Sequence, residues 1–214
     1  MQPVKAVPLN RQSIRLPIAE GFSTCVLGGG YLFGIAEIPD WLKPRAAQFE
    51  AMWEMHPAEF HLIQIHGRMV KTPRWQQAYG RDYHYSGGIN KASPIPSILE
   101  AFLGWARENV ALELNGLLVN WYDGLLGHYI GPHRDSPKNL LQNSPIVTIS
   151  LGEERIFRLR PWSTRKGNEV IDIPARNGTV FMLPWDTNRS FTHQIVRSKR
   201  NTGRRISITL RAFE

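Results

Sequence analysis

Residues 204–211 read RRISITLR, and this stretch decides the fold class. Three apolar residues alternate with polar ones, and a period of two is the pattern of a β-strand that buries one face. The polar positions then share the other face: Arg205, Ser207, Thr209 and Arg211. An edge strand that turns its charges to water has the same pattern, so the stretch alone predicts a strand and not a site.

Further apolar segments precede this strand, each bounded by Gly, Pro, Asn or Asp turns. We expect strands at about 116–122, 145–151, 155–160, 169–173, 178–183, 191–196 and 204–213. Two amphipathic helices are expected upstream, at 40–55 with Asp40 as N-cap, and at 96–109. Short strands at this spacing indicate a double-sheet jelly roll or barrel, and the apolar stripe of each helix is expected to pack on a sheet. The predicted class is α+β, mainly β.

Length and composition favour one ordinary globular domain in a reducing compartment. The chain has 214 residues and a single cysteine, Cys25, so no intramolecular disulfide can form. No stretch resembles a transmembrane helix or a signal-peptide core. We expect a monomer in the cytoplasm, or in the nucleus of a eukaryote. Residues 1–30 are interpreted as an N-terminal arm, because prolines near the start argue against the amphipathic helix of a transit peptide.

The positive charge lies in the C-terminal part of the chain. Residues 1–133 contain 11 Lys and Arg against 11 Asp and Glu, whereas residues 134–214 contain 15 against 7, which accounts for the net charge of +8. A basic surface beside a site attracts polyanions through counterion release. Surface lysines and arginines that only aid solubility give the same count.

A candidate metal motif lies in the turn-rich run 127–137, GHYIGPHRDSP. In an extended chain the side chains of His133 and Asp135 point to the same face. With the distant His193 they offer two imidazoles and one carboxylate, a set that occupies one face of a ferrous ion and leaves three positions open. A His-x-Asp triplet alone also fits a turn with a solvated histidine. The order of the residues in the chain, with His133, Asp135 and His193 followed by Arg205, favours the metal site. An arginine can bind the carboxylate of an organic acid that chelates the metal.

Beyond these residues, longer runs of the chain resemble the AlkB-like Fe(II)/2-oxoglutarate dioxygenases. They are LLVNWYDGLLGHYIGPHRD (117–135), PIVTISLGEERIFRLR (145–160), NGTVFMLPWDTNRSFTHQI (177–195) and GRRISITLRAF (203–213). The upstream run KTPRWQQAYGRDYHYSG (71–87) is similar to the segment that these proteins use as a lid over the substrate base. The resemblance implies one dioxygenase domain over 31–214, with a lid at about 66–95 and a double-stranded β-helix (jelly-roll) core at about 116–214.

The resemblance also implies a role for each motif residue. Fe(II) would be bound by His133, Asp135 and His193. The co-substrate 2-oxoglutarate would be bound by Asn120, Tyr122, Arg205 and Ser207, with Arg211 beside its metal-chelating end or the substrate. The residues themselves agree: Asn120 and Tyr122 alternate on one strand, so an amide and a phenol share a face and can bind a keto acid. A buried polar pair satisfied by backbone is the alternative interpretation.

Substrate contacts are expected from the lid and from the residue after the metal motif. Trp75, Tyr83 and Tyr85 offer aromatic faces on which a flipped or single-stranded base can stack, although aromatic residues in a loop often anchor it to the core. Base-repairing members of the family usually carry acidic residues directly after His-x-Asp. Here the chain reads Ser136, Pro137, Lys138, and a lysine suits a phosphate better than a base edge.

We therefore expect an oxidative demethylase of N-alkylated bases in DNA or RNA that uses Fe(II), 2-oxoglutarate and O2. Nucleic acid is the expected partner, as a single strand or a flipped base, and no membrane is involved. The same oxygenase chemistry on a protein side chain or a small molecule stays open, as does a non-catalytic nucleic-acid binder. Intact ligands and arginines count against the binder. A zinc hydrolase is disfavoured, because no glutamate accompanies the ligands as a general base.

Overall fold

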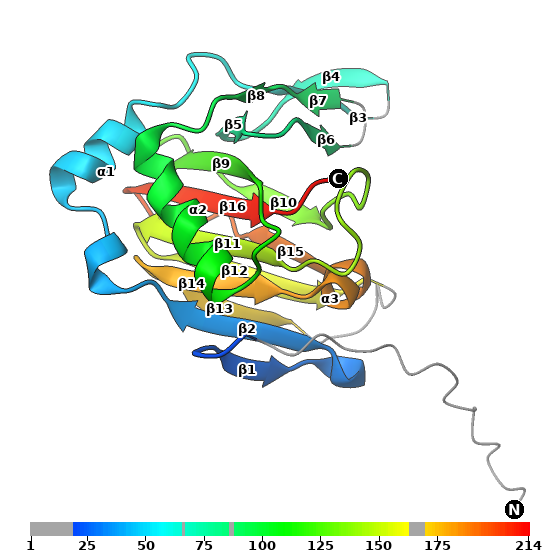
Figure 1. The fold of residues 1–214 in the computed structure, drawn as a ribbon. Helices are drawn as coiled ribbons and strands as arrows, with labels where there is room; N and C mark the ends of the chain where they lie inside the picture. The colour runs from blue at the N-terminus through cyan, green and yellow to red at the C-terminus, as the bar shows by residue number, and fades with distance from the viewer. Residues whose placement is uncertain (1–18, 66, 86–87, 163–169) are drawn as a thin grey trace, which may run out of the picture.

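An eight-stranded sheet supports the fold in the computed structural model, which describes residues 19–65, 67–85, 88–162 and 170–214. Within these residues its strands lie in the order β1 (Ser23–Val26), β2 (Leu32–Glu37), β14 (Thr179–Leu183), β11 (Ile146–Gly152), β16 (Arg204–Arg211), β9 (Gly116–Asp123), β5 (Trp75–Tyr79) and β8 (Ala92–Ser93). All neighbours are antiparallel except β5 and β8. The chain is thus α+β and mainly β, with its C-terminal strand in the interior of the large sheet (Figure 1).

A smaller sheet packs on one face of the large one. In order, its strands are β10 (Ile130–His133), β15 (Phe191–Ile195), β12 (Arg155–Pro161) and β13 (Ile171–Ala175). One apolar cluster contains residues of both sheets, among them Phe33 and Phe181 from the large sheet and Phe157 and Leu159 from the small one. The rings of Phe33, Phe157 and Phe181 stack on one another, with centroids 4.4–5.9 Å apart. The polar side chains of the site lie in the same space between the sheets.

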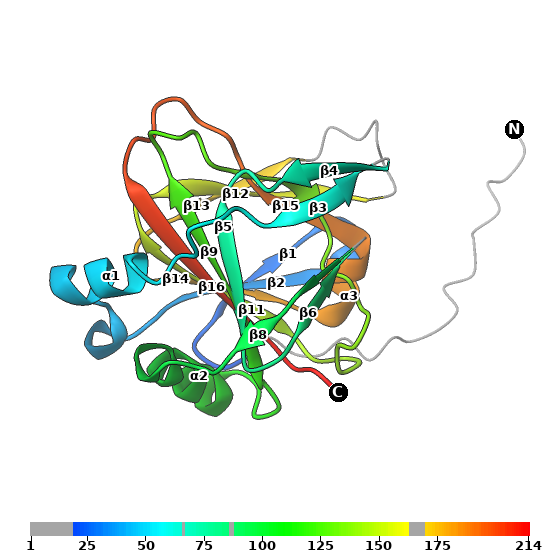
Figure 2. The same cartoon turned by 90° about the horizontal axis from the view of Figure 1, so that it is seen from above.

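Helices cover the opposite face of the large sheet. They are η2 (Asp40–Leu42), α1 (Ala46–Trp53) and α2 (Ser97–Asn109), and both α-helices lie on the same side in Figures 1 and 2. Leu99 and Phe102 of α2 join a second apolar cluster with Ile206 and Ile208 of β16. These isoleucines alternate along β16 with the polar residues that face the small sheet, as the period of two predicts. Two short helices complete the described residues: η1 (Gly28–Gly30) and α3 (Trp185–Ser190).

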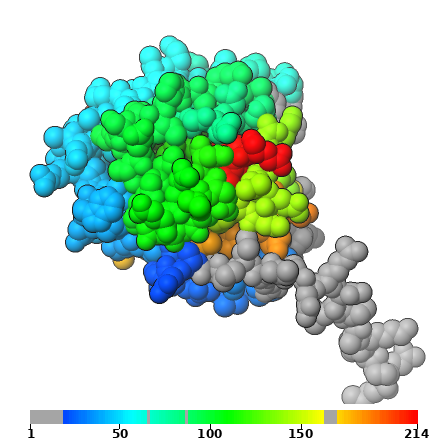
Figure 3. All heavy atoms as spheres, in the orientation of Figure 1, coloured from blue at the N-terminus to red at the C-terminus, as the bar shows by residue number. Residues whose placement is uncertain are grey.

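Two short hairpins extend from one end of the sheets. They pair β3 (Leu62–Ile65) with β4 (Arg68–Lys71), and β6 (Tyr83–Tyr85) with β7 (Gly88–Asn90). Together with β5 and β8 they include most of the segment predicted as a lid, 66–95. Figure 3 shows this blue-green segment directly above the red C-terminal residues. The hairpins expose apolar side chains, and Met69 is 60% exposed.

The predicted elements from residue 116 onward are confirmed within a residue or two. The predicted helix 40–55 is wrong in its extent: it divides into η2 and α1, because Pro44 lies between them and cannot continue a helical hydrogen-bond ladder. Residues 19–30 of the predicted arm include β1, which pairs with β2, and residues 1–18 lie outside the described residues. Among the described residues no helix combines the length and the apolar character needed to cross a membrane.

Candidate metal centre and co-substrate site

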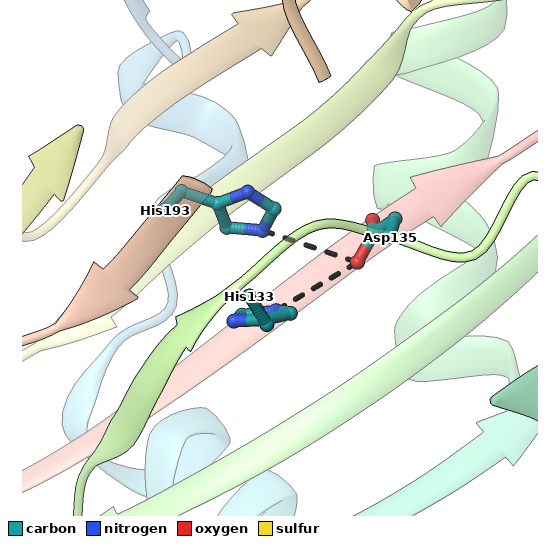
Figure 4. Close-up of side chains that lie close together, drawn as sticks. All are labelled: His133, Asp135 and His193. Atoms are coloured by element: carbon teal, nitrogen blue, oxygen red, sulfur yellow. Dashed lines mark ion pairs between the residues drawn. The ribbon is translucent and has the colours of Figure 1, made fainter. Parts of the chain in front are cut away.

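Strand pairing brings the two candidate histidines side by side. His133 of β10 pairs directly with His193 of β15, and their ring centroids lie 4.3 Å apart. Asp135 follows β10, and its Oδ1 lies 3.7 Å from His133 Nε2 and 3.9 Å from His193 Nε2 (Figure 4). Of the described residues, these three form a group whose ligand atoms all lie within 4.8 Å of one another. The predicted triad therefore converges at one point, at the end of β10.

Asp135 is held by partners from separate elements. Arg211 of β16 donates from Nε and Nη2 to Oδ2 at 2.9 and 2.7 Å, and the Tyr83 hydroxyl of β6 donates to Oδ1 at 3.2 Å. Asn188 of α3 exchanges two hydrogen bonds with the Asp135 backbone. Burial opposes ionisation, but Arg211 and the two histidines outweigh it and hold the pKa of Asp135 well below its ordinary value. The carboxylate is charged and fixed in orientation.

Both histidines are neutral bases at pH 7. Burial lowers the pKa of His133 and brings the pKa of His193 to about 3, with the neighbouring His133 adding to the shift of His193. His133 Nδ1 lies 2.9 Å from the Gly131 carbonyl oxygen; the tautomer that donates this hydrogen bond leaves the Nε2 lone pair free. His193 Nδ1 is buried without a partner in the described part of the chain. Two imidazole lone pairs and a fixed carboxylate fit a divalent transition metal.

A buried cation lies at the other end of β16. Arg205 is fully buried, its Nε donates to Ser150 Oγ at 2.9 Å, and its guanidinium carbon lies 4.9 Å from the centre of the Tyr122 ring. Burial lowers the pKa of Arg205 to about 10, partly offset by Tyr122. Its Nη1 and Nη2 have no partner among the described residues. Buried donors of this kind are costly unless a ligand satisfies them, and a carboxylate suits them.

Sequence reasoning missed Arg74, which lies just before β5. Its Nε donates to Asn120 Oδ1 at 2.7 Å and its Nη2 to Gln76 Oε1 at 2.9 Å. Because an arginine only donates, it directs the oxygen of the Asn120 amide toward itself and leaves the amide NH2 for an acceptor. Its charge also acts on Tyr122, Tyr83 and Asp135, so it lies among the site residues. In the sequence Arg74 is one of several basic residues of the run 71–87, and only its burial beside Asn120 distinguishes it.

The predicted substrate residues occupy different places. Trp75 stacks on His56 and Phe60, with centroids 4.2 and 5.1 Å away, so the protein itself provides its stacking partners. Tyr83 is buried beneath Arg211 and bonded to Asp135. Tyr85 is half-buried, and its hydroxyl lies 3.5 Å from the carbonyl oxygen of Leu62. Lys138 is exposed three residues after Asp135.

Predicted co-substrate residues line neighbouring strands. Ser207 of β16 pairs in register with Asn120 of β9 on one side and Ser150 of β11 on the other, and Arg205 pairs with Tyr122. A two-histidine, one-carboxylate centre between two β-sheets, with a buried arginine further along the same strand as Arg211, defines the class of non-haem iron oxygenases that use an organic-acid co-substrate.

The comparisons with known proteins place the chain within that class. Residues 30–211 match the model of the 2OG-Fe(II) oxygenase superfamily, and the chain belongs to this superfamily, in its AlkB-like branch. The enzyme is thus an Fe(II)- and 2-oxoglutarate-dependent dioxygenase. It is 29% identical to the DNA oxidative demethylase ALKBH2 of Mus musculus, over 84% of this chain and 77% of that protein.

Two further similarities are more distant. The alpha-ketoglutarate-dependent dioxygenase alkB homolog 3 of Rattus norvegicus is 25% identical over 80% of this chain and 59% of that protein. The solved structure of OsALKBH1 has a TM-score of 0.53 at 14% identity, covering 84% of this chain and 97% of its own, and this likeness concerns the fold alone.

Proposed function

We propose that this oxygenase removes alkyl groups oxidatively from N-alkylated bases of DNA or RNA. The observation that carries the proposal is the convergence of His133, Asp135 and His193 within 4.8 Å, between two sheets of a chain similar to named DNA oxidative demethylases. The two sheets correspond in this proposal to the double-stranded β-helix. The three side chains would hold Fe(II), through the two Nε2 atoms and Asp135 Oδ1.

The polar residues along β9 and β16 would hold 2-oxoglutarate. Arg205 would bind its distal carboxylate with the two nitrogens that lack partners in the described chain, and Tyr122 lies against the same guanidinium. The Asn120 amide, oriented by Arg74, would donate toward the keto-acid end of 2-oxoglutarate. Ser207, which pairs with Asn120, lies between Arg205 and Arg211 along β16. Arg211 would keep Asp135 ionised and in place. When bound, iron and 2-oxoglutarate would supply the oxidising chemistry together with O2, which gives one oxygen atom to succinate, formed with CO2 from the keto acid, and the other to the substrate.

Exposed basic residues around the triad support a nucleic-acid substrate. Arg134, between His133 and Asp135, stacks on Trp162 at 4.1 Å, and Trp162 is 50% exposed. Lys138 is also exposed, three residues after Asp135. Cations of this kind position a phosphate backbone, and an exposed aromatic ring can stack on a base. An N-methyl group of the substrate would be hydroxylated at the centre with an oxygen atom from O2, and the hemiaminal would release formaldehyde and leave the unmethylated base.

The proposal is tested with protein loaded anaerobically with Fe(II) and 2-oxoglutarate, then exposed to O2 and a panel of methylated single- and double-stranded oligonucleotides. We expect formaldehyde and the unmethylated base in the mass spectrum, in amounts that match the succinate formed. His133→Ala serves as the inactive control, and Asp172→Asn, in an exposed pair with Arg158, serves as the active one. Succinate formation that no methylated oligonucleotide stimulates would overturn the nucleic-acid substrate.

A second candidate substrate class is favoured by one observation. Ser136, Pro137 and Lys138 follow Asp135 where base-repairing enzymes of this family usually carry acidic residues. Without an acidic acceptor, an exocyclic amine of a base has no charged partner at that position. Stimulation of succinate formation by a methylated peptide or a small amine, and not by oligonucleotides, would favour this second class.

A further inference from the structure

Arg155 is a buried cation with no assigned role. It lies at the start of β12, is 1% exposed, and its Nη2 donates to the Gly203 carbonyl at 3.2 Å and lies 3.1 Å from Glu153 Oε2. Its Nε and Nη1 are buried and have no partner among the residues that the structure describes. A guanidinium with two unsatisfied buried nitrogens is costly, so the fold retains it against a free-energy penalty.

The strand register places Arg155 at the same end of the site as Arg205. On β12, Leu159 pairs with His193, and Arg155 lies two positions further along the same strand face. On β16, Arg211 binds Asp135, and Arg205 lies three positions further along its face. Both strands therefore lead away from the metal residues to the same end. There the Arg155 guanidinium reaches Gly203, two residues before Arg205.

The two guanidiniums also affect each other electrostatically. Burial lowers the pKa of both, and the charge of Arg155 lowers the pKa of Arg205 further. The carboxylates of Glu153 and Asp123 stabilise the positive charge of Arg155 and raise its pKa. No carboxylate is bonded to Arg205 within the described residues. Four buried nitrogens of the pair lack partners there: Arg155 Nε and Nη1, and Arg205 Nη1 and Nη2. A carboxylate offers about four lone-pair sites and a negative charge, which matches these donors.

We propose that Arg155 is a second co-substrate-binding residue, which together with Arg205 binds the distal carboxylate of the 2-oxo acid and makes the site selective for dicarboxylates. The inference rests on the role proposed above for Arg205. It adds a contact from the small sheet, so that the far end of the co-substrate is held from both sheets. The competing explanation is structural: Arg155 would only tie the turn at Glu153 to Gly203.

The test compares two ligands that differ only at the distal carbon, 2-oxoglutarate and 2-oxopentanoate, which has the same five-carbon chain and no distal carboxylate. Their Kd values are measured by calorimetry on Mn(II)-loaded protein without turnover. For Arg155→Gln we expect 2-oxoglutarate to bind about tenfold more weakly, the loss typical of a charge-assisted hydrogen bond, and 2-oxopentanoate to bind as before. Arg155→Lys, which keeps the positive charge, should lose less affinity for 2-oxoglutarate than Arg155→Gln. Arg158→Gln, on the outer face of the same strand, is the matched control and should change neither Kd.

The outcomes separate the explanations. Equal weakening of both ligands, or no weakening of either, in a folded Arg155→Gln protein would overturn the proposal. If Arg155→Gln does not fold, the same comparison on Arg155→Lys decides, because lysine retains a charge for Glu153 and Gly203. Arg205→Gln tests the role proposed for Arg205 itself. If this variant also shows no selective loss of 2-oxoglutarate binding relative to 2-oxopentanoate, the distal carboxylate is bound elsewhere. None of these readouts depends on which alkylated substrate the enzyme uses.

Discussion

Arg211 donates two hydrogen bonds to a single oxygen of Asp135, at 2.9 Å from Nε and 2.7 Å from Nη2. Oδ2 is therefore occupied, and Oδ1 is the oxygen that faces the two histidines. Both partners are buried, so the pair differs from an exposed salt bridge: removing one member leaves an uncompensated charge in the interior. The metal centre and the stability of the fold are thus linked through this pair.

Replacing Asp135 should separate metal binding from stability. Asp135→Ala leaves Arg211 unpaired, and we expect a loss of about 3–5 kcal/mol in the free energy of unfolding. Asp135→Asn keeps an acceptor for Arg211 and should lose less stability, while both variants lose Mn(II) binding. Urea unfolding and calorimetric Mn(II) titration measure the two effects. Asp172→Asn, in an exposed pair with Arg158, is the control; equal stability of the Ala and Asn variants would contradict the argument.

Arg205→Lys should weaken binding of 2-oxoglutarate sharply. A lysine ammonium cannot reproduce the planar fork that Arg205 presents at a buried carboxylate. We expect the KM for 2-oxoglutarate to rise about tenfold or more, as for loss of a charge-assisted hydrogen bond, with Mn(II) affinity unchanged. An unchanged KM would mean that the co-substrate is anchored elsewhere.

Arg74→Lys should act on the co-substrate through Asn120. Without the 2.7 Å hydrogen bond from Arg74 Nε, the amide of Asn120 loses its fixed orientation. We expect the KM for 2-oxoglutarate to rise roughly fivefold or more, about the worth of one side-chain hydrogen bond, with little change in Mn(II) binding. Arg176→Lys, in an exposed pair with Glu154, is the matched control. A fall in kcat alone would indicate that Arg74 contacts the substrate instead.

Trp75→Ala should destabilise the fold more than it affects nucleic-acid binding. The ring stacks on His56 and Phe60 and meets Trp53 edge-on, so its loss leaves a gap in an aromatic cluster. We expect a loss of about 3 kcal/mol in the free energy of unfolding, at the lower end for buried Trp→Ala changes. The exposed Trp41→Ala is the control and should cost little. Loss of oligonucleotide affinity without loss of stability would support the base-stacking role.

Lys138→Gln should reduce the salt dependence of oligonucleotide binding. A phosphate contact releases a counterion, so the slope of log Kd against log salt concentration should fall by about 0.7 for a single strand. Base preference should stay unchanged, because phosphate contacts position the strand and base contacts specify it. Gln142→Asn, an exposed neutral residue nearby in the sequence, is the control. Salt-independent binding by the unaltered protein would count against a nucleic-acid partner.

The sequence predicted the parts of the site that depend on local periodicity. Alternation along 204–211 assigned Arg205 and Arg211 to one face, because side-chain direction in a strand follows from the backbone alone. Convergence with His193 could be expected from motif order. The pairing of His133 with His193 across two strands is a long-range relation, and only the folded chain gives it.

Other features could not be predicted because they depend on contacts between distant segments. Arg74 and Arg155 read in the sequence as ordinary basic residues, and only burial against the site distinguishes them. Trp75 read as an exposed lid ring, but the loop before β3 supplies its stacking partners. Strands β1 and β2 were missed because their residues lack a regular apolar pattern; β2 is stabilised by pairing with β14, and β1 by pairing with β2.

The hold on Asp135 from β6, β16 and α3 has a consequence for how the enzyme acquires its metal. Since the carboxylate and its backbone are already fixed by hydrogen bonds, loading an ion requires no segment to fold around it. A metal site whose ligands are already fixed cannot favour one divalent transition ion over another by rearranging around it. The intrinsic affinities of such sites rise from Mn²⁺ through Fe²⁺ to Co²⁺ and Ni²⁺. We therefore expect the iron occupancy of this centre to depend on the supply of iron relative to that of cobalt and nickel.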